Sequence, residues 1–459
     1  MSLAGVLAAL LIGAGWVVGV RPPGDNSFLT HLATGRIILD THHIPAHDIY
    51  SFSARGAPWV VQSWLASIIY AVADNAGGFR AIMLVLGVCT TVLVAMVWRL
   101  TEPARTLVPR VGITAATLII GAEFWVERPL LFGLVCLGVV LLAAEGRLRP
   151  QWLIPAMWVW VNVHGSFPLG LLALALLALG RKLDGGDPAV ELRALKYAVI
   201  GTLLGGINPI GPRLLVFPIE LLQRQDILQK IVEWQAPSFL DVTQRVFLLE
   251  IIVGALVLVR RPRWRIGLPY IVFVAAALLG ARNIVVASIV MVPGLAAGLE
   301  GLGSIDGSER RSIYRPVAAI VLALEAIIGL SALRQPGAKI ESHYPVAAIS
   351  YANAQGLLTA PHRLVAQDFV GNYIEGTLGA DANVFIDDRY DMYPKQVVDD
   401  YVTLLGGKPG WDRVLSRYDA DAVLWERDQP LAQLLDVSSD WRVVYRDAHW
   451  VLAVPRDHS

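Results

Sequence analysis

The sequence has few charged residues, no formal net charge and only two cysteines. Only 17% of its 459 residues are charged, whereas an average soluble domain has about 25%. The formal net charge is zero, which gives no basis for a nucleic-acid partner. The two cysteines, Cys89 and Cys136, both lie in long apolar runs and suggest neither a disulfide framework nor a metal site. These shortages disfavour a disulfide-rich secreted domain and point to a lipid environment.

Hydrophobic residues make up 55% of the chain, and the mean hydropathy is +0.55. A helix needs roughly 17–25 apolar residues to cross a bilayer, and fewer where it is broken. Residues 3–20 form the first apolar run, which we interpret as a retained helix because it has no charged leader or clear cleavage site. The predicted fold is a polytopic α-helical membrane protein with about eleven transmembrane helices, near 3–20, 81–98, 111–125, 130–144, 152–163, 167–180, 195–208, 246–259, 266–281, 284–300 and 315–332.

The connections between these segments alternate in charge. One set holds 16 Lys or Arg in about 55 residues, and the opposite set holds 10 in about 105. Because basic loops stay on the cytoplasmic side, we predict a protein of the inner (cytoplasmic) membrane with a cytoplasmic N-terminus. The loops 21–80 and 209–245 and the C-terminal segment are then extracytoplasmic. The basic set comprises 99–110, 145–151, 181–196, 260–265 and 302–315.

Two segments of the first outer loop are predicted to lie along the membrane rather than across it. Residues 27–39 place Phe28, Leu32 and Leu39 on one helical face, which is typical of an interfacial helix. Residues 59–74 are apolar but contain Gln62 and Ser63, and a full span here would invert every later loop. We therefore predict an interfacial or half-inserted helix at 59–74.

The composition changes at about residue 334, so we predict a transmembrane domain over 1–333 and an extracytoplasmic domain over 334–459. Strands alternating with helices indicate an α/β fold for the second domain. No glycine-rich phosphate loop occurs in it. The expected strands are 363–369, 382–386, 421–425, 441–445 and 450–454, with helices at 397–405 and 411–418.

Charged and polar residues gather in the connections on the predicted outer side. Charges near membrane spans are costly and therefore informative, and a cavity there would suit an anionic, partly apolar ligand. For Asp25 we favour a functional role, because it lies close to the point where the first predicted span leaves the membrane. The candidate site residues are Asp25, His31, Asp48, Glu127, Arg128, His164, Glu233 and Arg282.

Structural explanations compete with several of these assignments. Glu127 beside Arg128 fits a structural ion pair as well as it fits a functional site. For His164, a structural and a functional role are equally favoured. His42, His43 and His47 lie within six residues, but their spacing does not favour zinc. The run 387–389, Asp-Asp-Arg, follows a predicted strand, and we interpret it as a structural turn with an internal salt bridge.

The order of these features resembles the GT-C superfamily of membrane glycosyltransferases. One span is followed by an outer loop with an early Asp, a surface helix, a later Asp and a Trp-Leu helix. Members of this superfamily include protein O-mannosyltransferases and the aminoarabinose transferase of lipid A. Further segments of this chain resemble a largely uncharacterised bacterial group of GT-C-like membrane proteins. These segments are ERPLLF, WVNVHGSF, INPIGPRLL, IVEWQAPSF, ARNIVVASIVMVP and FIDDRYDMYP.

The resemblance implies a sugar donor carried on a polyprenyl phosphate or pyrophosphate and used at the outer face of the membrane. It implies Asp25 as the catalytic base and Asp48 as a second acidic candidate, and in some members such a residue helps to bind a divalent metal or the acceptor. Arg128 and Arg282 would bind phosphate, while His31, Glu127, His164 and Glu233 would bind the sugar or the acceptor. The acceptor would be a glycan, a lipid or a protein of the cell envelope. No metal ligand is assigned.

Two other functions remain open from the sequence. A transporter or flippase of a lipid-linked solute is one, although transporters typically carry internal repeats and charges near the middle of the bilayer. A non-catalytic assembly factor, in which 334–459 binds a partner, is the other.

Overall fold

The computed structural model describes residues 1–224, 227, 234–303, 305 and 307–456, and it divides into two compact units. The helical unit comprises Met1–Pro23, Ala76–Gln223 and Gln229–Pro336. The mixed unit comprises Gly24–Asn75, Arg224–Leu228 and Gly337–Ser459. The loop 21–80 was predicted to belong to the transmembrane domain, whereas the structure groups residues 24–75 with the C-terminal segment.

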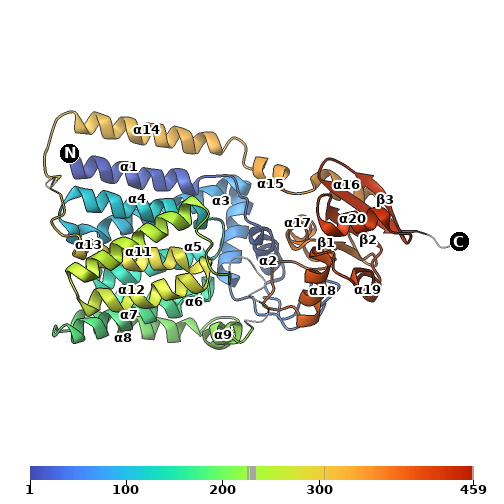
Figure 1. The fold of residues 1–459 in the computed structure, drawn as a ribbon, viewed down its shortest axis with the longest axis horizontal. Coiled ribbons are helices and arrows are strands. Elements are labelled where there is room, and N and C mark those ends of the chain that lie inside the picture. The colour runs from blue at the N-terminus through green and yellow to red at the C-terminus, as the bar shows by residue number, and fades with distance from the viewer. Residues whose placement is uncertain (225–226, 228–233, 304, 306, 457–459) are drawn as a thin grey trace. The chain divides into compact units, whose positions relative to one another are not determined.

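The helical unit is a bundle of helices that run side by side (Figure 1). Each of the eleven predicted apolar segments falls on one helix of the structure. The helices are α1 (Leu3–Gly19), α3 (Trp64–Leu100, of which the part after Asn75 belongs here), α4 (Leu107–Phe124), α5 (Leu130–Ala144), α6 (Leu153–Val163), α7 (Pro168–Leu183), α8 (Ala189–Gly205), the short α9 (Arg213–Leu222), α11 (Val242–Arg260), α12 (Trp264–Leu279), α13 (Ile284–Gly298) and α14 (Tyr314–Ala332).

Among the described residues, five helices are long and apolar enough to cross a membrane. Three shorter apolar helices, α1, α5 and α12, accompany them. Together they identify a membrane protein. The five long candidates are Trp64–Ala104, Leu107–Phe124, Val242–Arg260, Ala281–Gly298 and Tyr314–Ala332.

Glycines let the helices approach closely. A Cβ on Gly201 of α8 would lie 2.6 Å from the carbonyl oxygen of Ile154 in α6. In α1, a Cβ on Gly19 would lie 2.7 Å from the Cα of Gly87 in α3. The Thr90 hydroxyl of α3 donates to the Gly15 carbonyl at 2.7 Å. Such small residues are the usual means of packing helices in lipid, where no hydrophobic force drives helices together.

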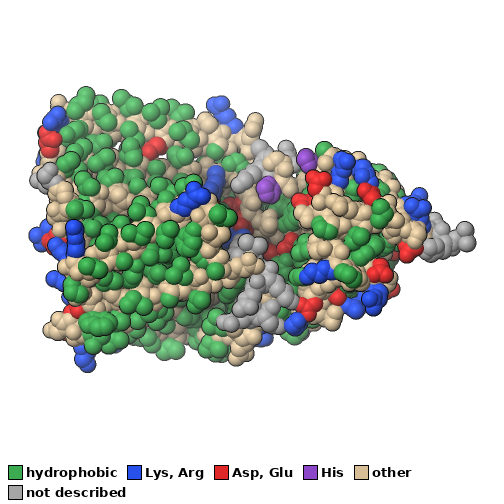
Figure 2. Space-filling model, in the orientation of Figure 1, with side chains coloured by type: hydrophobic (Ala, Val, Ile, Leu, Met, Phe, Trp, Pro, Cys, Tyr) green, Lys and Arg blue, Asp and Glu red, His purple; other side chains and the backbone are tan. Residues whose placement is uncertain are grey.

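Charged side chains of the helical unit gather mainly at the end where the chain begins, while its flank is hydrophobic (Figure 2). Arg265 at the start of α12 donates to Glu145 at 2.8 Å and to Glu191 at 2.9 Å. Arg181 reaches Glu191 at 2.6 Å. This network joins the ends of α5, α7, α8 and α12, all of them next to predicted basic connections.

Helix α3 is broken at Gly77 and Gly78. Gly78 has φ of +61° and ψ of −154°, a combination that is essentially restricted to glycine. The helix up to Asn75 belongs to the mixed unit, and the chain from Ala76 onward belongs to the helical unit. The break therefore separates residues 64–75, predicted to be an interfacial helix, from the apolar helix that follows.

The mixed unit is built on a four-stranded sheet of order β1-β2-β4-β3. Strands β1 (Leu364–Ala366) and β2 (Ala422–Glu426) are parallel, whereas β4 (Trp450–Pro455) is antiparallel to both β2 and β3 (Trp441–Arg446). Four of the five predicted strands are thereby confirmed. The fifth, 382–386, is wrong as a strand, because only Val384 forms isolated bridges, one to Leu364 and one to Ser51.

Helices surround this sheet, so the predicted α/β character of the C-terminal segment agrees with the structure. Helix α2 is the predicted helix at 27–39. It is amphipathic, and Phe28, Leu29 and Leu32 of its apolar face are buried. Gly376 of α17 packs against Leu29. The helices are α2 (Ser27–Thr41), α15 (Ala338–His343), α16 (Val346–Ala354), α17 (Asp368–Leu378), α18 (Lys395–Leu405), α19 (Trp411–Arg417) and α20 (Pro430–Val437).

Candidate functional site

One end of the helical unit carries four of the eight candidate residues, Glu127, Arg128, His164 and Arg282. Arg21 follows α1, and its guanidinium donates to the carbonyl oxygens of Ala122 at 2.6 Å and Trp125 at 3.3 Å. These carbonyls belong to the C-terminal end of α4, which has unsatisfied acceptors and a partial negative charge. Arg21 therefore ties the end of α1 to the connection that holds Glu127 and Arg128.

Glu127 and Arg128 lie in the short connection between α4 and α5. Their order, Glu-Arg-Pro, fits a turn, because Pro129 precedes the first residue of α5 and cannot continue a helix from α4. The Arg128 carbonyl accepts from Leu131 N–H at 3.0 Å. Glu127 is 1% exposed. A carboxyl group this deeply buried requires polar partners.

His164 lies between α6 and α7, and its ring is oriented by a local network. The Ser166 N–H donates to His164 Nδ1 at 3.1 Å, and the Ser166 hydroxyl lies 2.8 Å from the same atom. Trp160 Nε1 donates to that hydroxyl at 3.0 Å. Because Nδ1 accepts from a backbone N–H, the ring proton of a neutral His164 is on Nε2. Nε2 can therefore donate a hydrogen bond.

Arg282 lies in the turn between α12 and α13. Its guanidinium carbon is 4.1 Å from the centroid of the Trp234 ring, a cation–π geometry that fixes the side chain. Glu233, the neighbour of Trp234, lies outside the described residues. In the up-and-down order of the helices (Figure 1), Arg21, Glu127, Arg128, His164 and Arg282 all lie in connections at the same end of the helical unit.

Asp25 and His31 belong to the mixed unit, at and near the start of α2. The Ser27 N–H donates to Asp25 Oδ1 at 3.1 Å, so the carboxylate lies at the N-terminal end of the helix, where negative charge is stabilised. Asp25 is partly exposed. His31 Nδ1 lies 3.3 Å from the Ser67 hydroxyl, a contact from α2 to the first part of α3.

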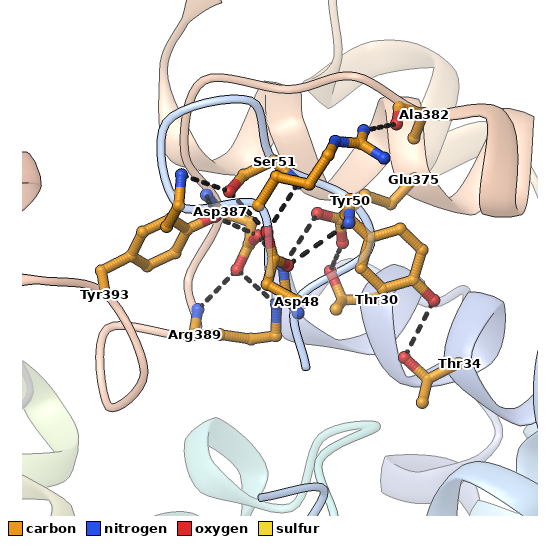
Figure 3. A network of polar contacts seen from close by, with 12 residues as sticks. Thr30, Thr34, Asp48, Tyr50, Ser51, Glu375, Ala382, Asp387, Arg389 and Tyr393 are labelled. Carbon is orange, nitrogen blue, oxygen red and sulfur yellow. Dashed lines mark hydrogen bonds and ion pairs between the residues drawn. The ribbon is translucent and has the colours of Figure 1, made fainter. Parts of the chain in front are cut away.

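Asp48 lies at the centre of a buried polar network (Figure 3). It is 2% exposed. Its Oδ2 accepts from the hydroxyl of Ser51 at 2.6 Å and from the N–H of the same residue at 3.0 Å. Its Oδ1 accepts from Arg389 Nη2 at 2.7 Å. Residues 24–75 are thereby joined to the C-terminal segment by a buried ion pair.

Arg389 also binds Asp387, with Nε to Oδ1 at 2.8 Å and Nη2 to Oδ2 at 2.5 Å. The predicted internal salt bridge of the run 387–389 is thus confirmed. Aromatic rings enclose the guanidinium, whose carbon is 4.3 Å from the Trp59 ring centroid and 4.9 Å from that of Tyr50. The Tyr393 hydroxyl donates to Asp387 at 2.5 Å.

Glu375 of α17 completes the network. The Thr30 hydroxyl of α2 donates to Glu375 Oε2 at 2.6 Å. Burial raises the pKa of the Glu375 carboxyl well above its usual value, and the charge of Asp387 raises it further. Burial alone would also raise the pKa of Asp387, but the Arg389 guanidinium holds it below its usual value.

No group of three or more His, Cys, Asp or Glu side chains is placed to hold a metal ion within the described part of the chain. His42, His43 and His47 are exposed near the end of α2. The charge-stabilising groups that the structure does show are guanidinium groups.

Sequence reasoning missed Arg21 and Glu375. Arg21 gave a weak signal as a charged residue at the end of a span. Glu375 gave none, because it lies in an ordinary amphipathic helix and its partner Thr30 is 345 positions away.

No protein-family model matches the chain, and no curated protein sequence matches it. Solved structures do. ArnT from Cupriavidus metallidurans, bound to undecaprenyl phosphate, is 13% identical with a TM-score of 0.53, over 99% of this chain and 98% of that one. The oligosaccharyltransferase of Archaeoglobus fulgidus, tethered with an acceptor peptide, is 12% identical with a TM-score of 0.52, over 92% of this chain and 69% of that one.

The same oligosaccharyltransferase in complex with Zn and sulfate gives a TM-score of 0.50. Both neighbours are GT-C proteins, as the sequence resemblance led us to expect. At sequence identities this low, the similarity shows a shared fold and nothing more specific. The chain therefore shares the GT-C fold of these two proteins.

Proposed function

We propose that the protein is a glycosyltransferase that takes a sugar from a polyprenyl phosphate and transfers it to a cell-envelope acceptor at the outer face of the cytoplasmic membrane. One observation carries the proposal. Arg21, Glu127, Arg128, His164 and Arg282 lie in connections at the same end of the helical unit, and the first of these connections leads within four residues into Asp25. The shared fold with ArnT, which was solved with undecaprenyl phosphate, supports a lipid phosphate as the carrier.

Sugar transfer from a lipid phosphate requires two kinds of group. A carboxylate must take the proton from the acceptor hydroxyl, and cations must stabilise the phosphate as it leaves. Asp25 is assigned the first role because it is partly exposed and lies at the start of a helix, where its carboxylate accepts from the Ser27 N–H. Arg128 and Arg282 are assigned the second, since guanidinium groups bind phosphate oxygens in pairs.

The remaining candidates are assigned to binding. His164, with its Nε2 proton oriented by Ser166, is suited to donate to a sugar or phosphate oxygen. His31, Glu127 and Glu233 would bind hydroxyl groups of the sugar or the acceptor. Direct displacement by the acceptor inverts the anomeric carbon. A divalent metal that assists the leaving phosphate stays a prediction.

We assign Asp48 a structural role instead of a second catalytic one. Its carboxylate accepts from Ser51 and Arg389 and is buried. Removal of a proton from an acceptor requires a carboxylate that the acceptor can reach. Asp25 is therefore the base in this proposal.

The test uses the full-length protein in lipid nanodiscs with a panel of radiolabelled undecaprenyl-phosphate monosaccharides. Asp25→Asn is expected to lower transfer at least about 100-fold, the usual contribution of a general base. Binding of undecaprenyl phosphate, measured by native mass spectrometry, should be unchanged. Arg128→Ala should weaken that binding about 10- to 100-fold, because a charge-assisted bond of about 1.5–3 kcal/mol is lost.

Arg213→Ala is the matched control, since Arg213 is an exposed residue paired with Glu220 on α9. It should leave binding and transfer unchanged. Full activity of Asp25→Asn would remove the catalytic assignment. Movement of intact lipid-linked sugar across the bilayer without bond cleavage would instead identify a flippase. Loss of transfer on chelation, restored by one divalent cation, would establish the metal.

A further inference from the structure

The buried network of the mixed unit contains more acid than base. Three carboxyl groups, those of Asp48, Glu375 and Asp387, surround the single guanidinium of Arg389, and all four residues are buried. Uncompensated buried charge is strongly unfavourable. If all three carboxyl groups were ionised, the network would hold two excess negative charges, so a proton on one of them stabilises it.

The geometry identifies Glu375 as the carrier of that proton. Asp48 and Asp387 both accept short bonds from Arg389, whereas the nearest Glu375 oxygen, Oε1, is 3.7 Å from the guanidinium. Oε2 accepts from the Thr30 hydroxyl at 2.6 Å, but no donor among the described residues reaches Oε1, which is buried. Burial raises the pKa of Glu375, and the charge of Asp387 raises it further, because a second ionised carboxyl group next to Asp387 is unfavourable.

We propose that Glu375 is a positioning residue, a neutral acid that carries the proton of the network while it accepts from Thr30, and so holds the start of α2. Asp25 lies two residues before the first residue of that helix, and it bonds Ser27 there. The part of this inference that concerns Asp25 rests on the proposed function. Through Thr30, the same bond joins the first outer loop to the C-terminal segment.

Other charged and titratable groups face Glu375 from each neighbouring element. The loop 46–59 contributes Asp48 and Tyr50, and the segment 387–393 contributes Asp387, Arg389 and Tyr393. From α2, Arg36 donates to the carbonyl of Gly376 at 3.0 Å and pairs with Asp74 at 2.7 Å. The Arg36 charge is thereby largely balanced by Asp74.

The direction of the pH dependence follows from the two pKa shifts. The pKa of Glu375 is raised in the folded protein, so its stabilising contribution is complete below the unfolded value of about 4.3 and falls as pH rises through the folded value. The pKa of Asp387 is lowered, so its contribution is already complete above about pH 5. Above that pH, the network is therefore destabilised as Glu375 loses its proton.

The test is hydrogen exchange of the α2 amides in the full-length protein in nanodiscs, from pH 5 to 9, corrected for the intrinsic exchange rate. In the wild type, we expect the opening of α2 to increase with pH by up to about tenfold per unit until Glu375 is ionised. Glu375→Gln is neutral at every pH and keeps an oxygen that accepts from Thr30, so its α2 opening should stay flat with pH. Glu375→Ala should open α2 at every pH.

Thr34→Val is the matched control. Thr34 is buried on α2, and its hydroxyl bonds Tyr50 at 3.1 Å, so this variant loses a comparable bond without touching Glu375. Its pH slope should equal that of the wild type. Thr30→Val is the second probe, because it loses the bond to Glu375 and should loosen α2 while the titration persists.

Two results would overturn the inference: a wild-type pH slope in Glu375→Gln, or α2 opening in Glu375→Gln as large as in Glu375→Ala. The transfer assay separates this inference from the proposed function. Glu375→Gln should remove the alkaline fall in transfer that accompanies the opening of α2. If Asp25→Asn were active, the proposed base would fail, but the exchange result on Glu375 would stand.

Discussion

Arg389 combines two partners that are far apart in the chain. Asp387 is two positions away and Asp48 is 341 positions away. The local bond was predictable from the sequence, because Asp-Asp-Arg after a strand fits a turn with its own salt bridge. The distant bond was not predictable, since nothing in the composition of the first outer loop identifies the segment that covers it.

Replacement of Arg389 by Met should destabilise the mixed unit by about 3–5 kcal/mol, because it leaves the carboxylates of Asp48 and Asp387 buried without a counter-charge. The measurement is chemical unfolding of the purified protein, followed through tryptophan fluorescence. The exposed Arg446, which pairs with Asp436, supplies the control. Arg446→Ala should change stability by no more than about 1 kcal/mol. Equal effects of the two variants would contradict the structural role of Arg389.

At the scale of elements, the apolar helices were the easiest features to predict. Each needs only a continuous hydrophobic run, and lipid requires every backbone group in it to be bonded within the segment. The segment 382–386 was harder. It has the composition of a strand, but Val384 alone forms bridges, and the chain then turns into the buried residues that bind Arg389. Tertiary contacts outweighed local strand preference there.

Glycines in the helical unit provide a test of its packing. Gly201→Ala should destabilise the protein by about 1–3 kcal/mol, because the new Cβ would lie 2.6 Å from the Ile154 carbonyl and would push α8 away from α6. Gly112 of α4 is the control, since a Cβ there meets nothing within 4 Å. Gly112→Ala should be neutral or stabilising by up to about 1 kcal/mol. The apparent Tm of both variants in detergent checks the difference, and a neutral Gly201→Ala would contradict the close α6–α8 contact.

At the scale of the whole molecule, the mixed unit restricts the path of the chain through the membrane. Residues 24–75 and 337–459 fold together, so we expect both segments on one side of the membrane and an even number of crossings between them. The five long helices alone give an odd number, so we expect shorter helices to cross as well. Ten helices fit this rule: the second part of α3, then α4 to α8 and α11 to α14.

These ten helices and α1 make up the predicted eleven spans, which we retain as a proposal together with the predicted orientation. Alkaline phosphatase fused after Ser459 should be active, because the enzyme folds only outside the cytoplasm. Green fluorescent protein fused within the basic connection at Asp187 should be fluorescent. Fluorescence of the C-terminal fusion would reverse the assigned orientation. The charge of the loops predicted this orientation, but no pattern of residues indicated that residues 24–75 and the C-terminal segment share one core.

The discontinuous mixed unit also determines the order in which the protein can mature. Residues 24–75 leave the ribosome early, yet Thr30 and Asp48 find their partners only after Glu375 and Arg389 have been synthesised. Until then, the early segment carries exposed apolar and charged groups that a quality-control protease can recognise. A chain that stops before Gly337 thus lacks more than its last portion, because the first outer loop is left without the surface on which it folds.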